Sequence, residues 1–546
     1  MAYIPAKYAP VIPQAVHTGT IEKTPILIVG AGPIGLSMAL EMGLRGHHVI
    51  LINKESQLTD GSRAICYAKR PLEIMDRLGF AERMVAKGVS WNIGKVFFQD
   101  RPEPVYSFDL LPVKDQKMPG MINVQQYYNE EYNIAALETL DNVELRWANK
   151  LTNIQNNDGG VIVNIETPEG DYQIHADWLI ACDGSNSPTR KMLDIGFEGE
   201  TFQDNFLIAD VKFTKAYPTE RHFWFDPVFN PGQSVLLHKQ PDDVWRIDFQ
   251  VGWDIDRKEI VKPENITPRI QAMFGEDVEF EYEWVSVYTF NCRQIETMAI
   301  DCVLFAGDSA HLVSPFGARG ANTGFQDTDN LAWKLDLVLT GTADETLIAS
   351  YDEERSLAAR INILNSTRST DFITPKSKVS RQFRDAVLQL SSDHAFARGF
   401  VNSGRLSMPV SYPNSSLNTP DDGPWQGGIE PGTNCIDAPV REAGKEAWLL
   451  NCLGWKFKLL IFAGNDCLTS SQIHDLAQLA KGKLPVEAVI IGTDGLEDVK
   501  GLVAQRYAAK SGDVYLVRPD QYVAARWHGF DLIKIENSVK TSLGLK

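Results

Sequence analysis

The chain has 546 residues, enough for two to four domains, and its 44% hydrophobic and 23% charged content is that of an ordinary soluble globular protein. Disordered and fibrous classes are therefore excluded. The formal net charge of -18 argues against nucleic-acid binding, because no run of Lys and Arg offsets it, but a local site for an anionic small molecule stays open.

The seven cysteines are scattered and never form a CxxC or a His-Cys cluster. This pattern predicts a reducing compartment and argues against structural zinc, a dithiol centre or any other metal site. The first two dozen residues lack a signal-peptide core, and no apolar run is long enough to span a bilayer. We expect a cytoplasmic protein without a membrane segment, whose residues 1–23 form a surface arm.

The first organised element is a beta-alpha-beta unit. A short apolar strand at residues 25–29 leads into Gly30, Gly32 and Gly35, then a helix, then a second buried strand at residues 49–52. Glycine at these spacings permits a tight turn, close approach of the main chain to a pyrophosphate, and close packing of helix on strand. A glycine turn of another doubly wound fold is the alternative.

The second strand ends without the acidic residue expected to bind a nucleotide ribose. Asn53 and Lys54 occupy this place, and Glu55 follows. Asn53 can accept one hydrogen bond through its amide oxygen, and Glu55 could serve if the strand were two residues longer. The ribose contact is therefore the least specific part of the pattern.

Three further segments carry candidate cofactor contacts. Arg63 precedes a helix and could reach a phosphate or the cofactor edge, although a solvated basic loop explains it equally well. Gln126 opens another helix and could donate a hydrogen bond to the cofactor. Asp183 ends a buried strand and is followed by Arg190, at the place where open alpha/beta sheets bind ligands.

Residues 205–302 change character, with alternating apolar and polar residues, many aromatics, and breaks at Pro and Gly. This pattern predicts an antiparallel sheet that can wall a pocket. Its aromatic residues could line that pocket, although any single one is more often part of the core. They are Phe223, Trp224, Phe225, Trp245 and Tyr288.

The chain then returns to the first domain through a buried strand at residues 303–307, which ends in Asp308. A glycine-rich loop through His311, Pro315, Gly317 and Asn322 follows, and we expect a helix from about residue 323. Main-chain N-H groups at such a helix start can face an anion. Two glycine-rich turns far apart in sequence thus indicate one nucleotide site.

The last part of the chain reads as a linker followed by a third unit. Residues 408–432 are dense in Pro, Ser, Asn, Asp and Gly. Residues 433–546 contain three strand-like segments around a helix and no CxxC, so we expect a packing or dimerisation role without redox chemistry.

These motifs resemble one family. Gly30 with its glycine pattern, Asp183-Gly184 and Gly307-Asp308 are similar, in that order, to the group A FAD-dependent aromatic hydroxylases. The segment GDSAHLVSPFGARGANTGFQDTDNLAWKL is similar to the family pattern over nearly its whole length, and Tyr351, Glu354 and Arg355 resemble its YxxER. The resemblance covers residues 24–407.

The resemblance implies an α/β fold of the para-hydroxybenzoate hydroxylase type. Residues 24–200 and 301–407 would form a Rossmann-like FAD-binding domain, and residues 201–300 an inserted antiparallel-sheet substrate domain. Residues 433–546 resemble the thioredoxin-like domain of the phenol hydroxylase and pentachlorophenol monooxygenase branch.

The resemblance also assigns residues to the cofactor. Ala318-Arg319 stands where many relatives have Gly-Gln, and Pro315, Gly317, Arg319 and Gly320 would form the catalytic loop against the flavin ring. The cofactor-binding set would be Gly30, Gly32, Pro33, Ile34, Gly35, Asn53, Lys54, Arg63, Gln126, Asp183, Gly307, Asp308, Pro315, Gly320, Ala321 and Asn322.

The implied activity is a monooxygenation. NADPH or NADH would bind transiently and reduce FAD, and molecular oxygen would form a flavin C(4a)-hydroperoxide that hydroxylates a small aromatic, phenolic substrate in aromatic compound catabolism. His222, His238 and Tyr288 are candidates for the base that ionises the phenol. An FAD-dependent dehydrogenase or oxidase and a non-catalytic flavin-binding protein remain alternatives, and a homodimer is possible.

Overall fold

A mixed sheet with a parallel centre organises the first part of the computed structural model, which describes residues 3–58, 64–91, 93–109, 113–157, 159–402, 407–464, 469–481, 484–492 and 495–545. The strand order is β17-β18-β11-β1-β2-β8, and β9 and β10 add antiparallel strands beside β11. Their bounds are β1 Ile21–Val29, β2 Val49–Asn53, β8 Val143–Trp147, β9 Lys150–Asn157, β10 Gly160–Thr167, β11 Gly170–Ala181, β17 Ala299–Ile300 and β18 Val303–Phe305.

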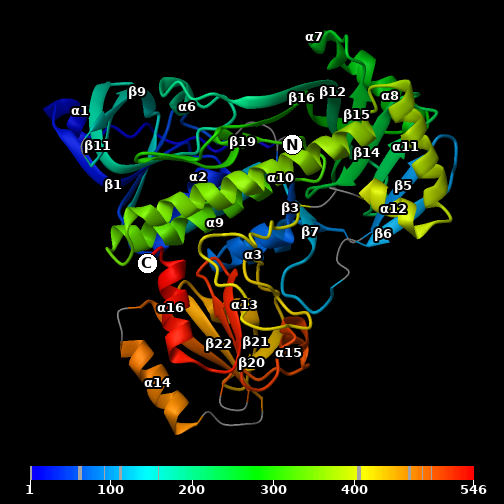
Figure 1. Ribbon diagram of the computed structural model, residues 1–546. Helices are drawn as coiled ribbons and strands as arrows, with labels where there is room; N and C mark the ends of the chain where they lie inside the picture. Colours follow the sequence, from blue (N-terminus) through cyan, green and yellow to red (C-terminus); the bar gives the residue numbers. More distant parts are fainter. Residues whose placement is uncertain are drawn as a thin grey trace.

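The apolar run of β1 is buried because helices cover this sheet. α2 contacts both α5 and α9, and Figure 1 shows α9 and α10 as two long helices beside each other. A continuous apolar strand is typical of a parallel sheet covered on its faces. The helix bounds are α2 Pro33–Leu44, α5 Gln126–Leu137, α9 Gly320–Leu339 and α10 Ala349–Ile373.

The described part of residues 1–23, the predicted surface arm, lies against the first domain. α1 occupies Gln14–Thr18, and β1 already begins at Ile21. Tyr3 stacks on Tyr127 with 3.5 Å between ring centroids, and Tyr8 stacks on Trp147 at 4.3 Å. These ring contacts hold the segment against the first domain.

A second eight-stranded sheet has the order β19-β16-β12-β15-β14-β13-β5-β6. Its pairs are antiparallel except β13 with β5, which are parallel. β5 and β6 come from the chain well before residue 201, so the sheet extends beyond the range expected for it, and they cover the edge that β13 would otherwise expose. The bounds are β5 Ile93–Phe98, β6 Tyr106–Asp109, β12 Glu198–Phe213, β13 Arg221–Phe225, β14 Ser234–Lys239, β15 Val244–Val251, β16 Phe280–Gln294 and β19 His311–Leu312.

Short elements complete the first two units. α8 packs its buried Ile266 and Ile270 on one face of the second sheet, and β3, β7 and β4 form a small separate sheet. The bounds are β3 Cys66–Ala68, α3 Lys69–Arg77, α4 Ala81–Lys87, β4 Val89–Ser90, β7 Met121–Asn123, α6 Pro188–Met192, α7 Arg257–Ile260, α8 Pro263–Phe274, η1 Gly307–Ser309, η2 Glu345–Ile348, α11 Lys378–Ser391 and α12 Ala395–Asn402.

The C-terminal unit is built on a sheet of order β23-β22-β24-β25 and lies below α3 and α9 in Figure 1. β22 and β23 are parallel, whereas β24 and β25 are antiparallel to their neighbours. The thioredoxin-like prediction depends on this arrangement. The bounds are β20 Pro439–Glu442, β21 Lys445–Trp448, α13 Leu449–Leu453, β22 Phe457–Gly464, α14 Ser470–Lys481, β23 Val486–Gly492, α15 Leu502–Tyr507, β24 Asp513–Val517, β25 Val523–His528 and α16 Leu532–Ser542.

The segment expected as a linker, residues 408–432, packs against both neighbouring units. Tyr412 is 1% exposed and its hydroxyl accepts a hydrogen bond from Arg355 at 2.6 Å. The Ser415 hydroxyl donates to a Glu354 carboxylate oxygen, also at 2.6 Å. On the other side, the Thr419 hydroxyl donates to the Ser538 hydroxyl of the C-terminal unit at 2.8 Å. The segment therefore connects the units through specific contacts despite its loop-like composition.

Buried charges also join the C-terminal unit to α9 and α10. Arg518 lies 2.6 Å and 2.9 Å from the two carboxylate oxygens of Glu354, and the Lys334 ammonium lies 3.0 Å from the same carboxylate. All three side chains have 0% exposure. Such a network restrains the two units relative to each other, since separating them would break the buried Arg518–Glu354 ion pair.

Candidate active site

The turn between β1 and α2 depends on glycine at its first and last positions. Gly30 has a φ of +105°, and a Cβ there would lie 2.6 Å from the Cys182 carbonyl oxygen. A Cβ on Gly35 would lie 1.9 Å from the Gly30 carbonyl oxygen, so α2 can approach the turn only without a side chain here. A Cβ on Gly32 would meet nothing within 4 Å. Open space therefore lies beside the backbone at the start of α2.

The amino end of α2 has the chemistry of an anion site. Its N-cap is Gly32, no side chain caps it, and its first turn carries no acidic residue. Pro33 occupies the first turn, and Ile34 contacts Gly307, where an added Cβ would lie 3.1 Å from the Ile34 side chain. The positive end of the helix dipole and uncapped N-H groups fit the pyrophosphate of a dinucleotide.

Asn53 closes the glycine turn from the neighbouring strand. Its side-chain oxygen accepts a hydrogen bond from the Ala31 N-H at 3.1 Å, and its side-chain nitrogen donates to the Glu55 carbonyl at 3.1 Å. Lys54 is 66% exposed and lies 3.8 Å from the Glu55 carboxylate. Asn53 thus supports the turn, and its contact with a ribose stays a prediction.

The other two predicted strand ends meet the same edge of the sheet. β11 lies between β1 and β18, so Asp183 and Gly307 follow adjacent parallel strands. One Asp183 oxygen accepts from the Thr189 N-H at 2.9 Å, and the other is buried without a hydrogen-bond partner among the described residues. Asp308 is exposed. A buried carboxylate oxygen that lacks a donor fits a cofactor that brings hydroxyl groups.

Arg190 connects two of these strand ends. Its guanidinium donates to the Ser309 carbonyl at 2.9 Å and to the Ser185 carbonyl at 2.8 Å, and it lies 3.9 Å from the Phe197 ring centroid. These contacts use the guanidinium within the protein. Arg190 therefore positions the segments after β11 and β18.

The loop before α9 is shaped by two left-handed residues. Gly317 has a φ of +100° and Ala318 a φ of +53°. Phe316 is buried and packs edge-on against Phe206 of the second sheet, with 5.2 Å between ring centroids, whereas Pro315 is exposed. The loop thus lies between the two sheets.

α9 begins at Gly320, three residues before the expected start. Arg319, its N-cap, already has helical backbone angles, and no side chain caps the helix. Gly320, Ala321 and Asn322 therefore form the first turn, where N-H groups without helical partners can face an anion. The glycines made this turn look like a loop in the sequence.

Asn322 ties this helix start to the small sheet. Its side-chain oxygen accepts from the Ala68 N-H at 2.9 Å, and its side-chain nitrogen donates to the Cys66 carbonyl at 2.8 Å and to the Ala318 carbonyl. Both ends of the amide are therefore used. Asn322 fixes the loop conformation whatever it contacts in a cofactor.

Arg319 places a buried positive charge at the same loop. It is 4% exposed, and its guanidinium donates to the Asn362 side-chain oxygen at 2.5 Å. Burial lowers the pKa of Arg319 to about 10. The side chain is still a cation at neutral pH.

Gln126 holds the segment that follows Arg63, and Arg63 itself lies outside the described residues. The Gln126 side-chain oxygen accepts from the Ala64 N-H at 3.1 Å, and its nitrogen donates to Glu130 at 2.8 Å. These contacts place Gln126 beside the predicted cofactor segment.

Asp327 of α9 links the segment after β18 to α10, and it was not predicted from the sequence as a site residue. Its carboxylate accepts from the Gly307 N-H at 2.9 Å, pairs with His311 at 2.7 Å, and pairs with the Arg355 guanidinium at 2.7 Å. His311 and Arg355 hold the pKa of Asp327 below its usual range despite burial. Its place in the quoted glycine-rich segment, seven residues after Gly320, was the available signal.

Strand alternation sorts the aromatic candidates of the second sheet onto two faces. Phe223 pairs with Leu236, and Phe206 pairs with Tyr288, on the face that contacts Phe316. His222 pairs with Leu237 on the other face. Only the first face borders the loop before α9.

The predicted bases are separated by the same rule. His238 and Tyr288 lie on the face toward Phe316, and Tyr288 is 38% exposed. His222 lies on the opposite face, 2.9 Å from the Glu220 carboxylate. Trp224 and Trp245 share its face. The fold therefore brings His238 and Tyr288 to the site and leaves His222 behind the sheet.

The comparisons with known proteins match this geometry. A family model described as FAD binding domain matches residues 23–366, which is more than half of the chain. The chain belongs to the FAD-binding domain family. FAD is therefore its cofactor, in agreement with the open glycine turn, the uncapped helix and the Asp183 oxygen.

Two relatives similar to this chain carry the name hydroxylase. The 3-(3-hydroxy-phenyl)propionate/3-hydroxycinnamic acid hydroxylases of Escherichia coli O81 (strain ED1a) and Klebsiella pneumoniae (strain 342) are each 27% identical to it. The matches cover 92% and 94% of this chain and 91% and 92% of theirs. The similarity thus extends through nearly the full length of both proteins.

Solved structures share the fold of this FAD-binding protein. The flavin-dependent monooxygenase PieE is 20% identical, with a TM-score of 0.82 over 96% of this chain and 99% of its own. Aklavinone-11 hydroxylase is 22% identical, with a TM-score of 0.79 over 96% of this chain and 100% of its own. The similarity includes the C-terminal part, because a match of this extent cannot stop at residue 407.

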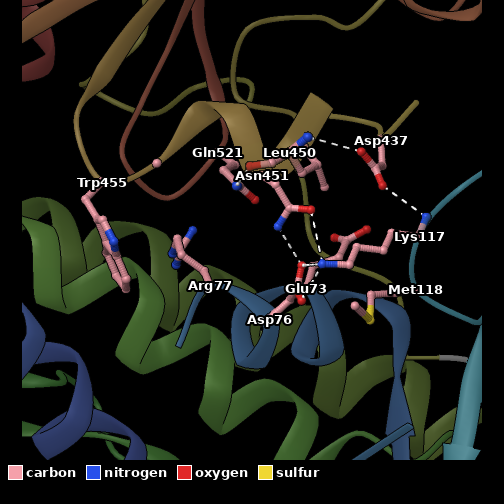
Figure 2. Close-up of a pocket in the computed structure, with 11 residues that line it drawn as sticks. Glu73, Asp76, Arg77, Lys117, Met118, Asp437, Leu450, Asn451, Trp455 and Gln521 are labelled. Atoms are coloured by element: carbon pink, nitrogen blue, oxygen red, sulfur yellow. Dashed lines mark hydrogen bonds and ion pairs between the residues drawn. The ribbon is translucent and has the colours of Figure 1, made fainter. Parts of the chain in front are cut away.

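A separate pocket of about 200 Å³ lies between α3 and the C-terminal unit (Figure 2). Its polar side chains are bonded to one another: the Lys117 ammonium lies 2.8 Å from the Asp76 carboxylate, and Asn451 donates to Asp76 at 2.7 Å. None of the predicted flavin residues lines it. The pocket belongs to the seam between the units.

The described residues lack two other features. Every described helix is too short or too polar to traverse a bilayer, and no group of His, Cys, Asp or Glu within the described ranges is arranged to hold a metal ion.

Proposed function

We propose that this protein is an FAD- and NAD(P)H-dependent monooxygenase that hydroxylates a small aromatic, phenolic substrate. The observation that carries the proposal is the contact between Phe316 in the loop before α9 and Phe206 on the second sheet. It brings an aromatic and polar sheet face next to the predicted flavin-ring loop, where a ring substrate and a flavin can meet. The hydroxylase names of the relatives support the same reaction.

In this proposal, one group of residues binds the cofactor and a second group excludes water from the site. The open turn at Gly32 and the start of α2 would hold the pyrophosphate, and the N-H groups in the first turn of α9 would lie toward the flavin. FAD, when bound, supplies hydride acceptance and oxygen activation. Phe206, Phe290 and Phe316 form a buried aromatic cluster that keeps water from the reacting atoms.

His238 is the better placed of the predicted bases, but it acts as a neutral hydrogen-bonding group. Burial and the cations Arg221 and Arg246 hold its pKa well below the usual range of histidine. A phenol can therefore be oriented by His238, whereas a strong base is not available from it. Tyr288 on the same face is a second orienting group.

Oxygen incorporation separates the proposal from its alternatives. The FAD-loaded protein is incubated with NADPH or NADH, isotopically labelled oxygen and a panel of phenols, and product mass is recorded. We expect one labelled atom in a hydroxylated product. Substrate oxidation without label would establish a dehydrogenase or oxidase, and the absence of any turnover with bound FAD would favour a non-catalytic flavin protein.

Finer assignments belong to the same proposal. We propose a cytoplasmic enzyme of aromatic compound catabolism, a homodimer, and a C-terminal unit of the thioredoxin-like kind found in the phenol hydroxylase branch. The parallel pair β22 and β23 with antiparallel β24 and β25 supports the last point. Sedimentation of the purified protein tests the dimer directly.

A further inference from the structure

Two buried polar side chains stand side by side on the sheet face that borders the flavin-ring loop. Phe223 pairs with Leu236, so Arg221 and His238, each two residues away on its strand, occupy the same face at neighbouring positions. Arg221 is 8% exposed and His238 is 3% exposed. Their surroundings decide what they can bind.

The guanidinium of Arg221 forms no ion pair within 4 Å in the described part of the chain, although the Asp248 carboxylate acts on it from a longer distance. Its one hydrogen bond is to the Cys66 sulfur at 3.6 Å, and its Nε is buried without a partner. The rings of Trp91 and Phe223 lie 5.2 Å and 5.0 Å from it. The aromatic contacts stabilise the cation, but they leave the planar N-H fork available.

Arg246, on the same sheet face, differs from Arg221 because its guanidinium is fully paired within the protein. Arg246 binds both oxygens of Asp210, each at 2.7 Å. Asp248 does not bind Arg221 in this way: among the described residues no contact within 4 Å joins the two side chains, so their attraction acts at longer range, and burial raises the pKa of Asp248 to about 6. Of these two arginines on the same sheet face, Arg246 is therefore paired with its own carboxylate and Arg221 is not.

His238 adds unused hydrogen-bonding capacity next to Arg221. Neither ring nitrogen has a hydrogen-bond partner among the described residues, and its Nε2 lies 3.8 Å from the Asp248 carboxylate. A neutral imidazole offers one donor and one acceptor. Buried groups of this kind are costly unless something binds them.

Cys66 connects this pair to the flavin-ring loop. Its sulfur accepts from Arg221, and its carbonyl accepts from Asn322 in the first turn of α9. Trp91 belongs to the same small apolar cluster as Cys66, and Ala318 of the loop packs against that cluster. A ligand held at Arg221 therefore lies next to the loop that faces the flavin.

We propose that Arg221 anchors the carboxylate of an aromatic acid substrate, with His238 as a second hydrogen-bonding contact. The inference rests on the proposed function and names the substrate class for that site. A carboxylate matches the planar fork of a guanidinium with two parallel hydrogen bonds, whereas a phenolate offers a single oxygen. The flanking aromatic rings suit the ring of the same ligand.

The proposal predicts that binding of the acid weakens as pH rises through about 6. The charged and titratable groups around Asp248 are Arg246, Asp210, Arg221, His238 and Cys66. Below pH 6 the Asp248 carboxyl is neutral, and above it a new negative charge opposes the anionic ligand. We expect Kd for a hydroxybenzoate to rise about tenfold between pH 5 and pH 7.5, since one unit of pKa coupling is a tenfold effect. In Asp248→Asn this rise should disappear, and an unchanged slope would contradict the assignment.

The decisive experiment compares matched ligands on the FAD-loaded protein by calorimetry. Each hydroxybenzoate is paired with the corresponding hydroxybenzyl alcohol, which has the same ring but no carboxylate. The variants are Arg221→Gln and Arg221→Lys. The control is Arg269→Gln, which removes a part-buried arginine of α8, the helix packed on the opposite face of the sheet. FAD content and thermal midpoint establish that each variant is folded.

We expect the wild type to prefer the acid, Arg221→Gln to bind it at least tenfold more weakly, and the alcohol to change less than threefold. Arg221→Lys should recover part of the binding, and Arg269→Gln should match the wild type. Equal loss of both ligands in Arg221→Gln, or no wild-type preference for any acid, overturns the proposal. Absence of labelled product with intact acid binding would refute the monooxygenase function alone.

Discussion

Replacing Arg518 with Met is expected to lower the free energy of unfolding by about 3–5 kcal/mol, because it leaves buried carboxylates without their main counterion. Arg518 is 0% exposed and contacts both Glu354 and Asp520. Among the described residues, Lys334 would then be the one cation still paired with Glu354. Urea unfolding, followed by flavin release and by tryptophan fluorescence, measures the loss and shows whether the units still unfold together.

The matched control is Arg441→Met in the same unit. Arg441 pairs with Glu497 at 2.7 Å, but the two side chains are 42% and 57% exposed. A surface pair of this kind contributes at most about 1 kcal/mol. If Arg518→Met were no more destabilising than Arg441→Met, the buried network would not hold the C-terminal unit.

The same network predicts a dependence on acid. Arg518 and Lys334 hold the pKa of Glu354 below its usual range. A carboxyl with a lowered folded-state pKa stabilises the protein above its unfolded-state pKa, and this contribution is lost as pH falls toward the folded value. The destabilisation by Arg518→Met should therefore be largest near neutral pH and should shrink below about pH 4.

Alanine at Gly32 or Gly35 is expected to abolish or weaken FAD binding for two different reasons. At Gly35 the added Cβ would lie 1.9 Å from a backbone oxygen, so α2 must move and the purified protein should contain no FAD. At Gly32 the added Cβ meets nothing within 4 Å, so the fold should be intact, but the methyl group occupies the space beside the pyrophosphate. We expect Gly32→Ala to raise the FAD dissociation constant at least tenfold.

Flavin content and apoprotein thermal midpoints distinguish the two effects. Gly32→Ala should keep the midpoint of the wild-type apoprotein, whereas Gly35→Ala should lower it. Gly196→Ala is the control, because a Cβ at Gly196 also meets nothing within 4 Å. Normal FAD affinity in Gly32→Ala would show that the pyrophosphate does not lie at this turn.

Local pattern was sufficient for the cofactor and much of the fold. The glycines before α2, the strand ends at Asp183 and Gly307, and the family pattern through Asn322 predicted an FAD-binding α/β fold, and the family match confirms it. These features are readable because each depends on neighbours in sequence: a turn that excludes Cβ, a buried strand, and a helix start. The roles of the individual residues remain predictions.

The residues proposed to bind the substrate could be identified only from the tertiary structure. Strand period alone could not tell which face of β13 and β14 borders the loop, so His222 and His238 looked equivalent, and Arg221 was not singled out at all. β5 joined the same sheet from far upstream, and residues 408–432 turned out to be packed through Tyr412 and Ser415. Such features depend on pairing between distant segments, whose register is set by the whole core.

The sequence by itself predicted FAD binding, because the closely spaced glycines of the first turn and the later segments of the family pattern can each be recognised from neighbouring residues. Only the tertiary structure decided which side chains share the sheet face beside the loop before α9, since Arg221, His238 and Cys66 come from separate strands and meet through their packing. Backbone chemistry is local in sequence, whereas the burial of a charge beside a given ring is a property of the folded chain.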